Sequence, residues 1–115
     1  MWKAISSGAC ATLLAAGPVF GHAKLLSTSP AAQAQLTQSP PSLTLTFNEN
    51  VRLAVLKLTT GGHDVPLVID RNAAAAPSVT IAVPPLAAGT YEVQWSALTP
   101  SDGHVVKGTY SFAIR

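Results

Sequence analysis

Residues 42–48 read SLTLTFN, and their leucine and phenylalanine side chains alternate strictly with serine, threonine and asparagine. Alternation with a period of two is typical of a β-strand that buries one face. A second alternating run, GTYEVQWSA at residues 89–97, places Tyr91, Val93 and Trp95 on one face. We therefore expect two amphipathic strands, with Trp95 filling the core between two sheets.

The rest of the chain is rich in β-forming residues broken by turn signals. Further strands are expected at residues 24–27, 51–59, 65–69, 78–83 and 109–114. The sequence GGHD at residues 61–64 predicts a hairpin loop, and the prolines at 84–85 end a strand. The only helix-like run, the alanines at residues 73–76, is too short to be stable. This pattern predicts an all-β, antiparallel, Greek-key, immunoglobulin-like sandwich or barrel of about seven strands.

Length and composition fit one folded domain. The chain has 115 residues, of which 48% are hydrophobic and 10% charged, and this excludes an intrinsically disordered chain. The seven basic and five acidic residues are scattered singly. Without a cluster of lysine and arginine, a nucleic-acid partner is not expected.

Residues 1–21 are expected to be a secretory signal peptide. A lysine near the start precedes an apolar stretch, and small residues stand before His22. That stretch is too short to span a bilayer, so the mature protein should not cross a membrane. Cleavage after Gly21 would make His22 the first residue of a mature domain, residues 22–115. Cleavage after Ala23 remains an alternative, because the small residues before it are also suitably spaced.

The mature chain contains no cysteine and no methionine, and its histidines are His22, His63 and His104. It lacks a cysteine nucleophile, a Gly-x-Ser-x-Gly elbow, a phosphate-binding loop and a His-Glu-x-x-His motif. The concentrated signal is Asp102-Gly103-His104. In an extended backbone, residues two apart project on the same side, and the glycine permits a tight bend. The alternative is a plain Asp-Gly turn beside an exposed histidine, and His63 is expected to be merely exposed to solvent.

A processed N-terminus changes what these residues can do. The α-amino group and the imidazole Nδ1 of His22 could close one chelate ring on a metal ion, since the amine has a pKa of only about 8. An imidazole nitrogen from His104 and an oxygen from Asp102 complete three nitrogens and one oxygen. This donor set favours Cu(II), with Ni(II) and Zn(II) as weaker contenders. Cu(I) is disfavoured because soft sulfur ligands are absent from residues 22–115.

At this point the chain resembles a known family, the CopC family of periplasmic copper-binding, or copper-resistance, proteins. The motifs that carry the resemblance are HAKL at 22–25, STSPA at 27–31, LTFNENV at 45–51, GTYEVQW at 89–95, SDGH at 101–104 and GTYSF at 108–112. The resemblance implies a seven-stranded Greek-key barrel or sandwich. It also implies one Cu(II) per chain, bound by His22, Asp102 and His104. Glu49, in a Phe-x-Glu motif, is implied as a weak axial ligand or a group behind the ligands, with a plain surface charge as the alternative.

The resemblance further implies a role in copper buffering, in resistance, or in delivery to a membrane copper transporter of the CopD type. We expect a monomeric binding protein and not an enzyme. Some family members carry a second, Cu(I) site in a methionine-rich loop, whereas residues 60–76 here contain His63 and no methionine. Two alternatives remain open: a copper oxidoreductase with an N-terminal histidine chelate, and a metal-free β-sandwich interaction module.

Overall fold

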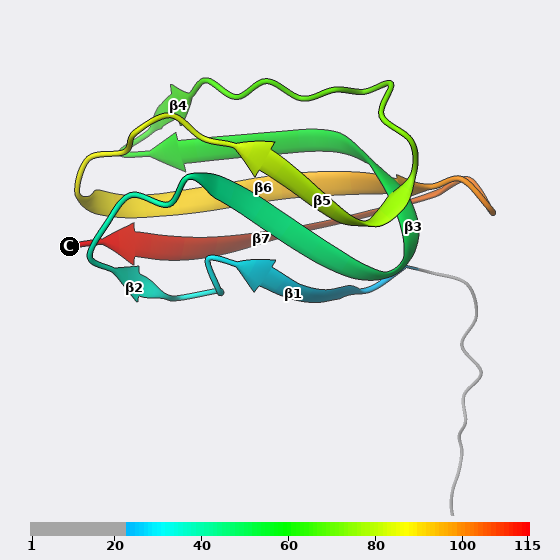
Figure 1. Cartoon of the computed structure of the whole chain (residues 1–115), viewed down its shortest axis with the longest axis horizontal. Helices are drawn as coiled ribbons and strands as arrows, with labels where there is room; N and C mark the ends of the chain where they lie inside the picture. Colours follow the sequence, from blue (N-terminus) through cyan, green and yellow to red (C-terminus); the bar gives the residue numbers. More distant parts are fainter. Residues whose placement is uncertain (1–22) are drawn as a thin grey trace, which may run out of the picture.

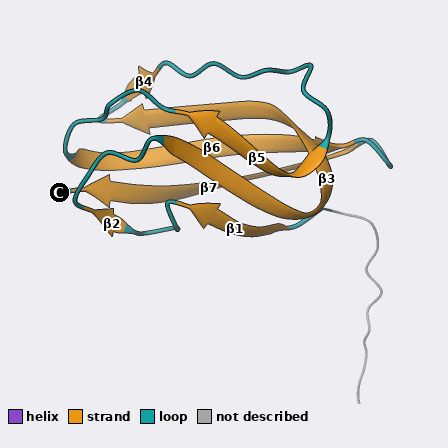
Figure 2. Ribbon diagram, viewed as in Figure 1, coloured by secondary structure: helices purple, strands orange, loops and turns teal. Residues whose placement is uncertain are grey.

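The computed structural model describes residues 23–115, which form a curled sheet of seven strands with no helix among these residues (Figures 1 and 2). The strands are β1 Leu25–Ser29, β2 Gln35–Leu36, β3 Ser42–Thr60, β4 His63–Val65, β5 Ala76–Ala82, β6 Gly89–Thr99 and β7 His104–Ile114. The all-β fold is therefore confirmed. The expected signal peptide, residues 1–21, and His22 lie outside the described residues.

Strand β3 connects the two layers of the barrel. Its first part, Ser42–Thr46, pairs with both β1 and β5, and its second part, Arg52–Thr59, pairs with β6. The main order is β1-β3-β6-β7-β2, while β4 and β5 also pair with β3. The register between β3 and β5 shifts between Thr46 and Val51. At such an irregularity a strand bends and twists more strongly, which lets β3 pass from one layer to the other.

Several expected strand limits are wrong. The runs at 42–48 and 51–59 are parts of one strand, because the polar residues between them stay extended through the bend of β3. The strand expected at 65–69 is only His63–Val65, since Pro66 has no N–H to donate to the sheet.

Two further differences concern β7 and its neighbour. Strand β7 starts at His104 instead of near residue 109. Strand β2, which was not expected, pairs in parallel with the end of β7, so the sheet is not purely antiparallel. A two-residue strand is too short to show any periodicity in the sequence. It is recognisable only from its pairing with β7.

The core lies on the inward face of β3, β6 and β7. Phe47 and Trp95 meet edge to face, with ring centroids 5.3 Å apart. Trp95 is 7% exposed, which confirms it as a core residue. Gly108 stands opposite Trp95, and a Cβ there would lie 2.8 Å from the indole Cζ2. Glycine at 108 thus makes room for the indole ring.

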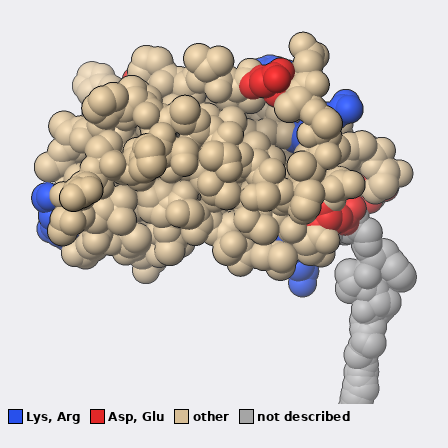
Figure 3. Space-filling view, in the orientation of Figure 1, with Lys and Arg blue, Asp and Glu red and all other residues tan. Residues whose placement is uncertain are grey.

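The barrel has two distinct ends (Figure 1). We call one the His104 end: it carries the turn between β6 and β7 and the start of β1. We call the other the His63 end: it carries the turn between β3 and β4, together with the C-terminus. Charged side chains are few on the face shown in Figure 3 and lie mostly toward these ends.

Candidate metal centre

The turn at the His104 end is closed by its own backbone. Thr99 pairs with His104 at the base of the hairpin. The Thr99 carbonyl accepts hydrogen bonds from the N–H groups of Asp102 (3.3 Å) and Gly103 (2.8 Å). Gly103 has a φ of 74°, in the left-handed region that glycine adopts readily. The sharp bend expected from Asp102-Gly103-His104 is therefore present.

This bend brings the Asp102 carboxylate onto His104. Oδ1 of Asp102 accepts the His104 backbone N–H at 3.0 Å, while Oδ2 lies 3.2 Å from Nδ1 of the imidazole. The His104 side chain is 55% exposed and that of Asp102 29%, so a dissolved ion can reach both. One residue's backbone and ring are thus both held by the same carboxylate.

The donor atoms of this pair suit one metal ion. Two adjacent ligand atoms, each about 2 Å from an ion at right angles, stand about 2.9 Å apart. The 3.2 Å between Oδ2 and Nδ1 is close to that spacing. A metal ion and a proton compete for such a carboxylate–imidazole pair, because ligands must lose their protons to bind. Two side chains alone, however, do not complete a coordination sphere.

Glu49 lies at the same end but apart from the pair. It follows Phe47 and precedes Val51 on the inward face of β3, and it is half-buried. It lines a shallow pocket with Pro100 and Ser101 of the hairpin turn. Among residues 23–115 no three His, Cys, Asp or Glu side chains stand close enough together to hold a metal ion. The structure therefore brings Asp102 and His104 together and does not join Glu49 to them.

The start of the described chain is fixed beside Glu49. Ala23 is buried, with 5% exposure. The Lys24 N–H donates to Oδ1 of Asn48 at 2.8 Å, and the Asn48 N–H donates back to the Lys24 carbonyl at 3.1 Å. These two bonds extend the β1–β3 ladder to the His104 end, where the hairpin turn also lies (Figure 1). His22, the predicted ligand that precedes Ala23, lies outside the described residues.

His63 has no part in this arrangement. It is the first residue of β4, at the opposite end of the barrel, and is exposed as expected. Its neighbour Asp64 pairs with Thr59, whereas His63 itself pairs with Thr60. Adjacent residues of a strand point to opposite faces, so this His and Asp diverge.

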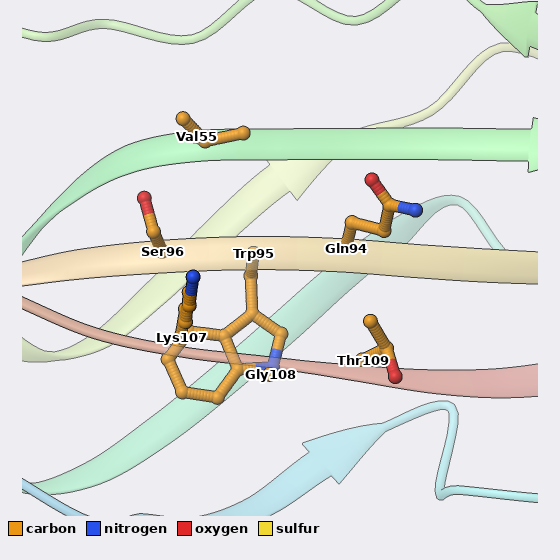
Figure 4. Close-up of a pocket in the computed structure, with 7 residues that line it drawn as sticks. All are labelled: Val55, Gln94, Trp95, Ser96, Lys107, Gly108 and Thr109. Atoms are coloured by element: carbon orange, nitrogen blue, oxygen red, sulfur yellow. The ribbon is translucent and has the colours of Figure 1, made fainter.

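A pocket bordered by β3, β6 and β7 is a separate feature. In Figure 4 the indole of Trp95 crosses Gly108, and the side chain of Lys107 lies beside it. The pocket is lined by Val55, Gln94, Trp95, Ser96, Lys107, Gly108 and Thr109. This lining contains no histidine, cysteine or carboxylate side chain.

Thr99, at the His104 end, is a buried polar residue that was not predicted from the sequence. Thr99 is fully buried, and its hydroxyl has no hydrogen-bond partner among residues 23–115. It continues the inward-facing series of Tyr91, Val93, Trp95 and Ala97. Extending that alternation by one step would have placed a polar side chain inside the barrel, directly before the Asp-Gly-His turn.

Fold and site together define a small all-β protein with an Asp–His pair, Asp102 and His104, at one end of its barrel. The family model described as the CopC domain matches residues 25–115. This match includes Asp102 and His104 and begins three residues after His22. The chain therefore belongs to the CopC family.

Named relatives agree with this assignment. Copper resistance protein C of Xanthomonas campestris pv. juglandis is 34% identical over 118 residues, covering 91% of this chain and 89% of the relative. Protein YobA of Escherichia coli (strain K12) is 32% identical over 109 residues, covering 90% of this chain and 87% of the relative. The chain thus spans nearly the full length of both relatives.

Solved structures show the same barrel. The crystal structure of CopC from Methylosinus trichosporium OB3b superposes with a TM-score of 0.68 at 30% identity, covering 81% of this chain and 93% of that one. PcoC, a methionine-rich copper resistance protein from Escherichia coli, gives 0.67 at 32% identity, covering 83% and 100%. Among residues 23–115, the structure has no helix long and apolar enough to cross a membrane.

Proposed function

We propose that this protein binds one Cu(II) ion per chain in the periplasm, after removal of residues 1–21. The ligands are the amine and imidazole of His22, the carboxylate of Asp102 and the imidazole of His104. Glu49 stands behind these ligands or contacts the ion weakly. The proposal extends family membership to a particular ion, oxidation state and set of residues.

One observation carries the proposal: the buried Ala23 and the Asp102–His104 pair lie at the same end of the barrel. In the sequence, His22 directly precedes Ala23. A terminal amine and a second imidazole nitrogen supplied there would complete what Asp102 and His104 leave unfinished. Without them, the described residues offer only two donor groups.

The choice of Cu(II) follows from the donor atoms. Three nitrogens and one oxygen suit the tetragonal geometry of Cu(II), which also binds most tightly in the divalent series. The copper-resistance names of the relatives support copper as the metal. PcoC is described as methionine-rich, whereas the single methionine here is Met1. We therefore propose a Cu(II) site without a companion Cu(I) site.

We further propose a role in copper buffering, resistance or delivery to a membrane transporter of the CopD type. Binding fits the site better than redox catalysis, because the anionic oxygen of Asp102 stabilises Cu(II) over Cu(I). The large aromatic side chains that could form a substrate platform, Tyr91, Trp95 and Phe112, are buried in the core.

The test begins with the exported protein. Intact mass should correspond to residues 22–115, and Cu(II) titration against a competing chelator should give one tight site with a type 2 electron paramagnetic resonance (EPR) spectrum. A variant with one alanine inserted between Gly21 and His22, its processing checked by mass, should bind at least about 100-fold more weakly because the chelate is lost. A mature chain starting at Lys24, or equal affinity of the extended variant, would refute the proposal.

A further inference from the structure

Thr99 is the polar exception on the inward face of β6. The other inward side chains of that strand, Tyr91, Val93, Trp95 and Ala97, are apolar or mainly so and are buried. Thr99 is 0% exposed, and its Oγ1 atom has no hydrogen-bond partner among residues 23–115. Burying a hydroxyl without a partner costs free energy, and a valine of the same shape would avoid that cost. Like Nε1 of Trp95 and the hydroxyl of Tyr110, the Thr99 hydroxyl has no partner among residues 23–115, but only Thr99 lies at the base of the Asp-Gly-His turn.

The position of Thr99 links it to the Asp–His pair. Thr99 and His104 are directly paired in the antiparallel ladder, so their side chains stand on the same face with Cβ atoms about 5 Å apart. The Thr99 carbonyl also holds the N–H groups of Asp102 and Gly103. The whole turn is thus built on Thr99, whose buried side chain lies at its base.

The surroundings of the hydroxyl on the other side are apolar. Strand β3 pairs Arg52 with Leu98, the residue before Thr99, and this ladder ends there. Val51, which precedes Arg52, pairs with Ala76 of β5. Val51 is buried, with 1% exposure, and its side chain carries no polar atom. A polar partner at the His104 end, where the proposed copper ligands lie, would satisfy Oγ1.

We infer that Thr99 is a positioning residue of the copper site: its hydroxyl forms a hydrogen bond with a polar group that the copper-bound site brings over it. This inference rests on the proposed Cu(II) function. In the copper-free protein the hydroxyl is buried at a cost, and on copper binding it gains its partner. Thr99 therefore lowers the stability of the free protein and raises the affinity for copper.

The test compares Thr99→Val with Thr99→Ser in the exported protein. Thr99→Val keeps the shape and removes the hydroxyl, so the copper-free variant should unfold at an equal or higher urea concentration than wild type. Its Cu(II) affinity, measured by chelator competition, should fall roughly tenfold, as for other groups that support metal ligands. Its EPR hyperfine splitting should shift. Thr99→Ser retains the hydroxyl and should keep the wild-type spectrum and an affinity within about threefold of wild type.

Thr60→Val is the matched control at the opposite end of the barrel. The Thr60 hydroxyl donates to the Thr90 carbonyl at 2.9 Å, so its loss should lower stability and leave copper binding unchanged. Wild-type affinity and spectrum in Thr99→Val would overturn the inference while leaving the Cu(II) function intact. Destabilisation or misfolding of copper-free Thr99→Val would overturn it too, since that would reveal a satisfied hydroxyl. Failure of wild type to bind Cu(II) would refute the proposed function and, with it, this inference.

Discussion

The two ends of the barrel carry hairpin turns of nearly the same composition and of different geometry. At the His63 end the order is Gly61-Gly62-His63-Asp64, and at the His104 end it is Asp102-Gly103-His104. His63 and Asp64 are adjacent in β4 and pair with different residues of β3, so they point apart. Asp102 and His104 are two apart, and their side chains meet at 3.2 Å.

Spacing and backbone, more than composition, thus separate a turn whose Asp and His side chains meet from one whose Asp and His side chains diverge. Gly103 allows the bend that returns Asp102 to His104, and the Thr99 carbonyl holds the bend in place. At the other hairpin, Gly61 and Gly62, with φ values of 55° and 82°, form the turn itself, and His63 follows them. Its histidine then enters a regular strand.

The largest difference between the two ends is expected in copper binding. His104→Ala removes a proposed ligand and should weaken Cu(II) binding by at least about 100-fold. His63→Ala, the control at the other hairpin, should bind like wild type, because His63 lies at the far end of the barrel. Chelator competition at one fixed pH measures both. Equal losses in the two variants would place copper elsewhere and remove the distinction between the ends.

A smaller effect, on stability, is expected when a glycine of either turn is replaced by alanine. Gly103→Ala and Gly61→Ala each put a Cβ into open space at a positive φ, 74° and 55° respectively. The cost is therefore backbone strain alone, about 1–2 kcal/mol of unfolding free energy in each case. Urea denaturation of the copper-free variants should show this similar loss at both ends.

Copper affinity should distinguish these two glycine variants where stability does not. In Gly103→Ala the strain falls between the two proposed ligands, so the affinity should drop with the stability. In Gly61→Ala it should stay at the wild-type value. A Gly103→Ala protein that keeps its affinity would mean that the bend does not position the pair.

The smallest expected effect is on the pH dependence of stability and concerns Tyr110, in strand β7 and outside both hairpin turns. Burial raises the pKa of the Tyr110 hydroxyl from 10.0 to about 12. A group whose pKa is higher in the folded state adds stability below its unfolded value, and this is lost as the pH rises through the folded value. The urea stability of wild type should therefore fall between pH 10 and 12 more steeply than that of Tyr110→Phe. Tyrosinate absorbance gives an independent check, and parallel pH profiles would contradict the prediction.

Much of the fold was predictable because apolar and polar residues alternate visibly along the long strands β3 and β6. Phe47 and Trp95 were readable as core residues, and they stack edge to face in the barrel. The continuity of β3 was not predictable, since Asn48-Glu49-Asn50 has the composition of a turn. Only pairing with β1, β5 and β6 on either side keeps that segment extended.

The sequence by itself determined the strands, the tight Asp-Gly-His bend and the kinds of donor atom available, because periodicity, turn chemistry and ligand type are local properties. The tertiary structure alone decided that the start of β1 and the β6–β7 turn share one end, and that the Thr99 hydroxyl lies buried beneath that turn. These placements depend on strand pairings between residues that are 15 to 22 positions apart for β1 with β3, and 33 to 46 apart for β3 with β6. Such pairings are set by burial in the assembled core, which no short stretch of sequence displays.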